Sequence, residues 1–334
     1  MSSKKFSVVI LVLLAIACSS PLVTEGKTEN LPNSEELSPM ADNQNFLPFL
    51  SVSPSPPIAP TPIPTTIPLP SPTPSITPIP PSGDAVIADH TVIAEFSNIP
   101  EDAAQKAAEM KVLFMHQSTG NNIEFYGFRC LAGERTDSTV YPQECLTYAL
   151  NPYDPFDWRS WAWKLWDTPM SDGPAKTDQW VSVVNARQQD YEILGMKFCY
   201  VDGWNLDFEY YREKMEQLEN TYPQKTFIWS TSVLWSEGTM REGNASQESI
   251  ERIQAFNQQL RDYALANDKF LYDPASIESR DSNGNFCEVN GNEALCDEYD
   301  DGGGGHPNVM GSIRLAKGFW WLIARIGGWD GIQE

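Results

Sequence analysis

The sequence predicts an α/β domain in which a mostly parallel sheet is covered by helices on both faces, a three-layer α/β/α sandwich. Three observations support this. Short apolar runs alternate along the chain with longer stretches of helical periodicity. The apolar runs do not alternate with polar residues, as expected for strands that are buried on both faces. The region from residue 84 onward, about 250 residues rich in Trp, Tyr and Phe, is long enough for one such domain.

Four apolar runs predict strands, and each is preceded or followed by a predicted helix. The strands are expected at residues 111–115, 191–201, 226–231 and 269–273. Helices are expected at residues 101–110, 158–166, 177–189, 206–222, 246–267 and 312–326. The helix at 246–267 has the strongest pattern, because Ser246 is a suitable N-cap and apolar residues recur at three- and four-residue steps. Because parallel strands end at the same edge of a sheet, functional groups are expected beyond their carboxyl ends.

The first residues are typical of an export signal. Lys4 and Lys5 precede an apolar run, residues 6–16, which is too short to predict a membrane-spanning helix. The run ends in Leu14-Ala-Ile-Ala-Cys18, which resembles a bacterial lipobox. That resemblance implies a signal peptide at residues 1–17, lipidation of Cys18, and an exported lipoprotein that faces the cell surface or the periplasm. An ordinary cleaved signal with an incidental cysteine is the alternative.

The segment between this signal and the domain is predicted to lack a packed structure. Residues 18–46 are polar and without sustained periodicity, which indicates disorder. Residues 47–83 are rich in proline, which fixes φ and removes backbone donors, so they form a semi-rigid linker. The globular domain is therefore assigned to residues 84–334.

The charge of the chain excludes one class of partner. Residues 1–83 contain three lysines and five acidic residues, so nearly all of the formal charge of −22 belongs to the domain. An acidic surface repels phosphate backbones, and nucleic-acid binding is therefore excluded as a main function. The membrane is expected to be contacted through the lipid anchor alone.

The chain contains six cysteines. Besides Cys18, two pairs are close in sequence, and export permits disulfides, so bridges are predicted between Cys130 and Cys145 and between Cys287 and Cys296. Cys199 lies in an apolar run and is expected to be a buried thiol. A zinc site is the competing interpretation, but no CxxC or HxxxH spacing supports it and the chain has three histidines, so no metal is expected.

The first segment that could carry chemistry is His116-Gln-Ser118-Thr-Gly120-Asn-Asn122, where a predicted strand ends and a helix could begin. A serine at that place presents its hydroxyl to solvent, while nearby backbone N–H groups can stabilise an oxyanion. The alternative is a serine that caps a helix.

The second segment is Asp300-Asp301-Gly-Gly-Gly-Gly-His306, a glycine-rich loop before the last helix. A neutral imidazole can take the proton of a serine hydroxyl, and a carboxylate on its far nitrogen fixes the tautomer. The alternative is a helix-entry loop that turns the chain or binds calcium through acidic residues at 297, 298, 300 and 301, although the EF-hand spacing is missing.

Together the two segments resemble the SGNH (GDSL) hydrolase family, whose serine follows the first strand and whose histidine lies in a late D-x-x-H loop. Phe256-Asn-Gln-Gln-Leu-Arg261 with the following strand resembles the family's late helix–strand unit, and His306-Pro-Asn-x-x-Gly311 resembles its last block. The resemblance covers about residues 111–326. It implies a flavodoxin-like fold and an ester hydrolase that needs no cofactor, with Ser118 as nucleophile and His306 as base.

The chain departs from the family pattern in three places. The family's G-D-S reads His116-Gln-Ser118 here, and the role of His116, which could line the site or cap the strand, stays open. The position three before His306 is a glycine, so Asp301 is the first substitute for the acid and Asp300 the second. Asp202 matches the last residue of the family's G-x-N-D block, but no Asn matches.

Oxyanion donors are therefore expected elsewhere. The candidates are the backbone N–H groups of Ser118 and Gly120 and the side chain of Asn121 or Asn122.

The sequence favours an extracellular serine esterase that deacylates, and in particular deacetylates, carbohydrate esters. Its partner would be an acylated small molecule or glycan. Aromatic platforms for sugars are possible at Trp residues 158, 161, 163, 166, 204, 229 and 235, although helical spacing favours core packing for most of them. The alternatives are an O-acyltransferase on the same fold and a non-catalytic surface lipoprotein that binds a glycan or another ligand.

Overall fold

The computed structural model describes residues 84–131 and 172–331. Several predictions lie outside these residues: the signal peptide, Cys18, the polar segment and the Pro-rich linker, the helix at 158–166, and Cys145. They stay predictions. None of the helices within the two described ranges has the length and apolar character needed to cross a membrane.

A five-stranded parallel sheet forms the centre of the domain and confirms the predicted fold class. The strand order is β1-β5-β4-β3-β2, and each neighbouring pair is parallel. The strands are β1 (Val86–Ala88), β2 (Val112–Met115), β3 (Ile193–Met196), β4 (Thr226–Ser230) and β5 (Phe270–Tyr272). Strand β1 was not predicted, because three residues are too few to show a pattern.

The register of the strands aligns their carboxyl ends at one edge of the sheet. Met115 of β2 pairs with Met196 of β3, and Ser230 of β4 pairs with Tyr272 of β5. The residues that follow these strands therefore come together in space, which is where ligands bind in open α/β sheets.

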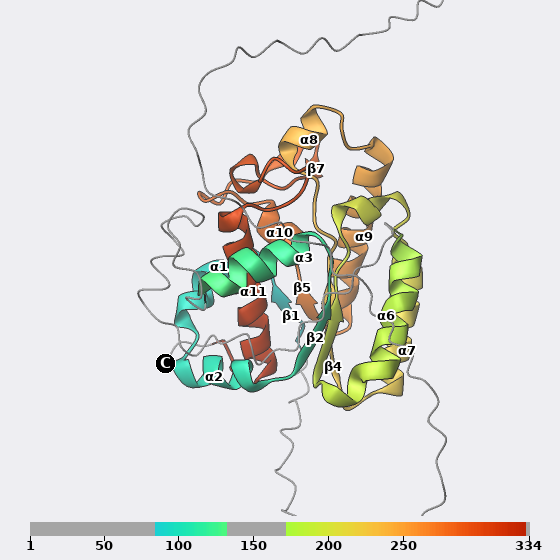
Figure 1. Ribbon diagram of the computed structural model, residues 1–334, viewed down its shortest axis with the longest axis vertical. Coiled ribbons are helices and arrows are strands. Elements are labelled where there is room, and N and C mark those ends of the chain that lie inside the picture. The colour runs from blue at the N-terminus through green and yellow to red at the C-terminus, as the bar shows by residue number, and fades with distance from the viewer. Residues whose placement is uncertain (1–83, 132–171, 332–334) are drawn as a thin grey trace, which may run out of the picture. The chain divides into compact units, whose positions relative to one another are not determined.

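Helices cover both faces of the sheet, as Figure 1 shows. One face carries α1 (Val92–Glu95), α2 (Glu101–Glu109), α3 (Thr119–Asn122) and α11 (Val309–Ile326), and the other carries α6 (Gly173–Arg187), α7 (Phe208–Thr221) and α9 (Gln247–Ala266). Each face has its own apolar core. Phe114 packs edge-on against Phe319 of α11 at 4.9 Å on the first face, and Phe198 packs against Phe256 of α9 at 5.4 Å on the second.

Side-chain caps explain where the main helices begin. Ser246 accepts a hydrogen bond from the Ser249 N–H, as predicted for the N-cap of α9. Asp207 caps α7 in the same way. Asn308 accepts from the Gly311 N–H, so α11 begins at Val309, three residues before its predicted start.

The predicted strand at 191–201 is shorter in the structure. β3 ends at Met196, and the chain turns at Cys199, whose N–H donates to the Asp202 carboxylate at 2.7 Å. This bond starts a short 3₁₀ helix, η5 (Tyr200–Trp204). The remaining short elements are η1 (Phe96–Asn98), η2 (Ile123–Phe128), α4 (Arg129–Leu131), η4 (Gln188–Asp190), α8 (Glu237–Arg241), α10 (Pro274–Glu278), β6 (Glu288–Val289), β7 (Asn292–Glu293) and η6 (Asp297–Tyr299).

The cysteines agree with the prediction as far as the structure describes them. Cys287 and Cys296 form a disulfide that closes the β6–β7 hairpin. Cys199 is a buried free thiol. Cys130 takes part in a disulfide, and its predicted partner lies outside the described residues.

Candidate active site

Ser118 lies in a sharp turn between β2 and α3, at the carboxyl edge of the sheet. Its backbone has φ 55° and ψ −103°. A non-glycine residue in this region is strained, at a cost of about 1–3 kcal/mol, and such strain concentrates at functional sites. The turn leaves the serine half-buried rather than enclosed. This is the kind of strand–turn–helix geometry that presents a nucleophile at the edge of a sheet.

The turn depends on Gly120. A Cβ at this position would lie 2.2 Å from His116 Nδ1, so the helix can approach the end of the strand only if residue 120 is glycine. His116 is itself 2% exposed, and burial together with the Lys197 charge lowers its pKa to about 3. His116 is therefore neutral and packs beneath the turn against Gly120.

His306 reaches Ser118 from the other end of the chain. Its Nε2 forms a short hydrogen bond with Ser118 Oγ. The two residues are 188 positions apart, and the topology brings them together because α11 packs against the face of the sheet that also carries α3. The structure thus brings together the two residues that the sequence analysis selected.

The other imidazole nitrogen, Nδ1, contacts a main-chain carbonyl. Nδ1 lies 3.0 Å from the Gly303 oxygen. A carbonyl oxygen can only accept a hydrogen bond, so Nδ1 carries the proton, and the Nε2 lone pair faces the serine hydroxyl. This is the tautomer that a general base requires.

Tyr200 of η5 supports the same carbonyl. Its hydroxyl donates to the Gly303 oxygen at 3.1 Å and lies 3.4 Å from His306 Nδ1, while its ring meets the imidazole edge-on at 5.4 Å. Burial, with the charges of Cys199 and Asp301, raises the pKa of Tyr200, so the hydroxyl stays protonated and remains a donor.

The expected acid is not on the imidazole, and this corrects the assignment of Asp301. Asp301 Oδ1 instead accepts a hydrogen bond from the Gly303 N–H at 2.7 Å. The Asp300 carbonyl accepts from Asn308 Nδ2 at 3.4 Å, and the main chain of Asp300 pairs with Pro307. Asp301 therefore holds the shape of the loop, and the group that orients His306 is the Gly303 carbonyl.

The glycine run gives the loop a path that side chains would block. Gly302 and Gly304 have φ of 84° and 87°, the left-handed region that favours glycine. At Gly305 a Cβ would lie 2.5 Å from the Tyr200 ring and 2.6 Å from the Leu234 carbonyl oxygen. At Gly303 a Cβ would lie 2.9 Å from His306 Nδ1. The main chain can therefore approach the imidazole more closely than a loop with side chains could.

Two further bonds lock this loop in place. Asn122 Nδ2 donates to the Pro307 carbonyl at 2.8 Å, which ties the serine helix to the residue after His306. The Ser236 N–H donates to the Gly304 carbonyl at 2.9 Å. One hydrogen of the Asn122 amide thus acts on the histidine loop.

The predicted oxyanion donors differ in whether they already make a hydrogen bond. The Gly120 N–H donates to the Gln117 carbonyl at 3.1 Å, so it is engaged within the turn. The Asn121 N–H donates to the Ser118 carbonyl at 2.7 Å, and the role predicted for the Asn121 side chain stays a prediction. Within the described residues, the Ser118 N–H makes no hydrogen bond, so it is a candidate donor.

Asp202 is a structural residue and does not line the site. It is fully buried, forms an ion pair with Lys176 Nζ at 2.5 Å and accepts the Cys199 N–H. The match of Asp202 to the family's block therefore corresponds here to a cap of η5.

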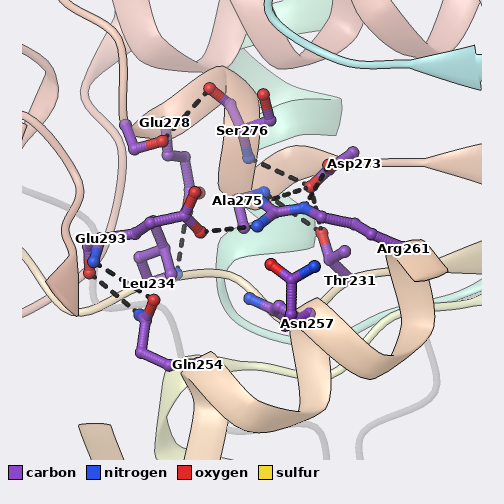
Figure 2. Close-up of polar contacts among 12 residues, drawn as sticks. Thr231, Leu234, Gln254, Asn257, Arg261, Asp273, Ala275, Ser276, Glu278 and Glu293 are labelled. Atoms are coloured by element: carbon purple, nitrogen blue, oxygen red, sulfur yellow. Dashed lines mark hydrogen bonds and ion pairs between the residues drawn. The ribbon is translucent and has the colours of Figure 1, made fainter. Parts of the chain in front are cut away.

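Buried polar residues also fix the ends of β4 and β5 (Figure 2). Arg261 of α9 makes two bonds to Asp273, at 2.7 and 3.0 Å, and one to Glu293 at 3.0 Å. Thr231 donates to Asp273 at 2.9 Å. Glu278 of α10 accepts from the Leu234 N–H at 2.9 Å, and burial raises the pKa of its carboxyl to about 8. This network joins α10 to residue 234, whose carbonyl oxygen lies beside Gly305 of the histidine loop.

No metal centre accompanies the site in the part of the chain that the structure describes. Across residues 84–131 and 172–331, no three His, Cys, Asp or Glu side chains are grouped so that they could hold an ion. The acidic residues considered as calcium ligands make other contacts: Asp297 pairs with Arg241, and Glu298 accepts from Ser282.

Fold and site together define the class: an α/β/α domain with a serine hydrogen-bonded to a histidine at the carboxyl edge of a parallel sheet. No protein-family model and no curated protein matches the chain. Among solved structures, a GDSL-like lipase from Bacteroides thetaiotaomicron is similar over 71% of this chain and 98% of its own, with 11% identity and a TM-score of 0.40.

Two other solved structures are similar at the same level. A G-D-S-L family protein from Desulfitobacterium hafniense has 9% identity and a TM-score of 0.39, and it covers 64% of this chain and 99% of its own. LAE5, an α/β hydrolase from the metagenome of Lake Arreo, has 15% identity and a TM-score of 0.36, and it covers 64% and 94%. The function proposed below rests on the geometry of the site itself.

Proposed function

We propose that this chain is a serine esterase that works with a Ser118–His306 dyad and a main-chain carbonyl in place of the usual acid. The observation that carries the proposal is the contact between Ser118 Oγ and His306 Nε2, at a strained turn, with the far nitrogen held by the Gly303 carbonyl. A structural serine or histidine has no need for this combination of strain, tautomer and partial exposure.

The reaction follows from these positions. Ser118 Oγ attacks the ester carbonyl carbon while His306 Nε2 takes its proton, and the Ser118 N–H stabilises the negative oxygen. The bond to the leaving alcohol then breaks, and the alcohol takes the proton from His306. Water attacks the acyl-serine with His306 again as base, which releases the carboxylic acid and restores the hydroxyl.

The substrate class proposed is acyl esters of carbohydrates, with acetyl esters first. Two features support it. The strongly acidic domain disfavours anionic substrates, and exposed Trp204 lies on η5, whose first residue Tyr200 contacts the site. We also propose that the domain is displayed outside the cytoplasm, with Cys18 as the lipid anchor and residues 47–83 as a spacer.

The test is covalent labelling followed by product analysis. A fluorophosphonate probe should label the wild-type chain, and Ser118→Ala should remove both the label and the hydrolysis of p-nitrophenyl acetate and acetylated xylan. Ser182→Ala, an exposed serine of α6, is the matched control. Labelling that survives in Ser118→Ala, or a wild-type chain that never labels, would favour the non-catalytic alternative. Transfer of acetate to an added glycan acceptor instead of water would identify the acyltransferase.

Incorporation of labelled palmitate tests the anchor separately. The wild-type chain should become labelled when it is expressed in a bacterium, and Cys18→Ala should not.

A further inference from the structure

Lys197 is a buried lysine directly beneath the Ser118 turn. It follows β3, its backbone N–H donates to the Met115 carbonyl at 3.1 Å, and the residue is 3% exposed. Its ammonium points to main-chain oxygens, because Nζ lies 3.3 Å from the Gln117 carbonyl and 3.5 Å from the Phe198 carbonyl. Burying an ammonium is costly unless it has partners, so its place beneath the proposed nucleophile needs a reason.

The geometry of one peptide group supplies that reason. The Gln117 carbonyl and the Ser118 N–H belong to the same planar trans peptide, so they point in opposite directions. Lys197 Nζ and the Gly120 N–H both hold the Gln117 oxygen on the interior side of the turn. The Ser118 N–H is thereby turned outward, where the oxyanion of an attacked ester would form.

We infer that Lys197 is a positioning residue that orients the Ser118 N–H as an oxyanion donor through its bond to the Gln117 carbonyl. The inference rests on the esterase function proposed above and adds to it a residue that touches no substrate.

The charges around Lys197 agree with this role. Burial lowers the pKa of Lys197, as does the Lys176 charge, whereas the Asp202 carboxylate raises it. His116, the other titratable group under the turn, is neutral because its pKa is lowered to about 3. Lys197 Nζ is thus a side-chain donor to the Gln117 carbonyl beneath the turn, a role that its N–H groups fill whether or not it is charged.

The test uses the full chain with Lys197→Met, which keeps an apolar side chain of similar length but removes the ammonium. We expect kcat for p-nitrophenyl acetate to fall by about tenfold or more while KM stays within about twofold, as for lost transition-state stabilisation. An alkyl trifluoromethyl ketone, which forms a tetrahedral adduct with the serine, should bind more weakly by the same factor as kcat/KM.

Lys225→Met is the matched control, since Lys225 Nζ also donates to a main-chain carbonyl, that of Tyr191 at 2.7 Å, but at the opposite edge of the sheet. It should lower thermal stability and leave kcat and ketone binding within about twofold. Lys197→Gln is a second variant that keeps a neutral polar group if the methionine is not tolerated; its loss should also fall on kcat and on ketone binding.

The inference is overturned if a folded Lys197 variant has wild-type kcat and ketone affinity, or if its loss falls on KM alone. These outcomes differ from failure of the proposed function. In that case the wild-type chain itself would neither be labelled at Ser118 nor hydrolyse the ester.

Discussion

The two loops that meet at the site are held in opposite ways. The Ser118 turn is held from below by buried side chains, His116 in contact with Gly120 and Lys197 on the Gln117 carbonyl. The histidine loop, residues 301–306, takes its shape from glycines where side chains would collide, and its carbonyls accept hydrogen bonds from Tyr200, the Ser236 N–H and His306. The serine turn therefore depends on the buried side chains beneath it, whereas the histidine loop depends on glycines that let its main chain approach the imidazole.

This difference is tested most strongly at His306, the residue that joins the loops. His306→Ala removes the base, and kcat/KM for p-nitrophenyl acetate should fall by a factor on the order of 10⁴ to 10⁶. Asn122 and Ser236 hold the loop around His306 through bonds that do not involve the imidazole. The unfolding temperature of the variant should therefore change little. A variant that retains more than a tenth of wild-type activity would exclude His306 as the base.

The next largest effect is expected at Gly120, in the loop that depends on side chains. Gly120→Ala places a methyl group 2.2 Å from His116 Nδ1. It should destabilise the fold by about 1–3 kcal/mol and lower kcat as the turn opens. Denaturant unfolding and ester hydrolysis measure the two effects.

Gly238→Ala serves as the control for that variant, because a Cβ in α8 would meet Asp297 at an ordinary 3.5 Å. It should be neutral or slightly stabilising. Equal behaviour of the two alanine variants would show that the contact with His116 does not constrain the turn.

The Asp301→Asn variant tests whether the Gly303 carbonyl or the Asp301 carboxylate orients His306. If the Gly303 carbonyl orients His306, the amide oxygen can still accept the Gly303 N–H, and kcat should change by less than about fivefold. If the carboxylate were the triad acid, the same substitution should cost about 10⁴ in kcat. A loss of that size would restore the original assignment of Asp301.

A modest effect is expected at Tyr200, whose hydroxyl supports the Gly303 carbonyl. Tyr200→Phe keeps the ring against His306 and removes one hydrogen bond, worth about 1 kcal/mol, so kcat should fall about two- to tenfold with KM unchanged. A change confined to KM would show that the hydroxyl contacts substrate instead.

The smallest expected effect is on stability alone, and it concerns the buried carboxyl of Glu278, which lies near Lys197. The pKa of Glu278 is raised from 4.5 to about 8, so the folded state holds a proton that the unfolded state releases above pH 4.5. Stability from this group is complete below pH 4.5 and is lost as pH rises through 8. Between pH 6.5 and 8 the wild type should lose about 1.5 kcal/mol relative to Glu278→Gln, as measured by urea unfolding. Parallel pH profiles would contradict the shift.

The sequence predicted most of the fold because the information lies in local patterns. The four predicted strands and the long helices, such as α9 with its Ser246 cap, were found from apolar periodicity and capping chemistry. Strand β1 was missed because three residues give no period. β3 was drawn too long because Cys199 continues the apolar run, whereas the chain turns there for a side chain–backbone bond to Asp202.

The site was predictable where a side chain carries the role and not where the main chain does. Ser118 and His306 were selected by residue type and by their positions beside a strand and before a helix. The Gly303 carbonyl could not be selected, since every residue has one. The S-x-G spacing of Ser118 and Gly120 was a usable signal for the tight turn, but Gly120 was interpreted as a donor instead. Lys197 gave no signal, because nothing in an apolar run reveals which lysine is turned inward.

The Cys287–Cys296 bridge has a practical consequence for anyone who prepares this protein. The bridged segment is connected to the site by two hydrogen bonds. The Leu295 N–H donates to the Trp235 carbonyl, and the N–H of Ser236, the residue after Trp235, donates to the Gly304 carbonyl of the histidine loop. Material produced in a reducing cytoplasm would lack this cross-link, and its hairpin could detach and release the histidine loop. Weak turnover in an ester-hydrolysis assay of such a preparation would then reflect the missing cross-link and would not test the proposed activity of the oxidised protein.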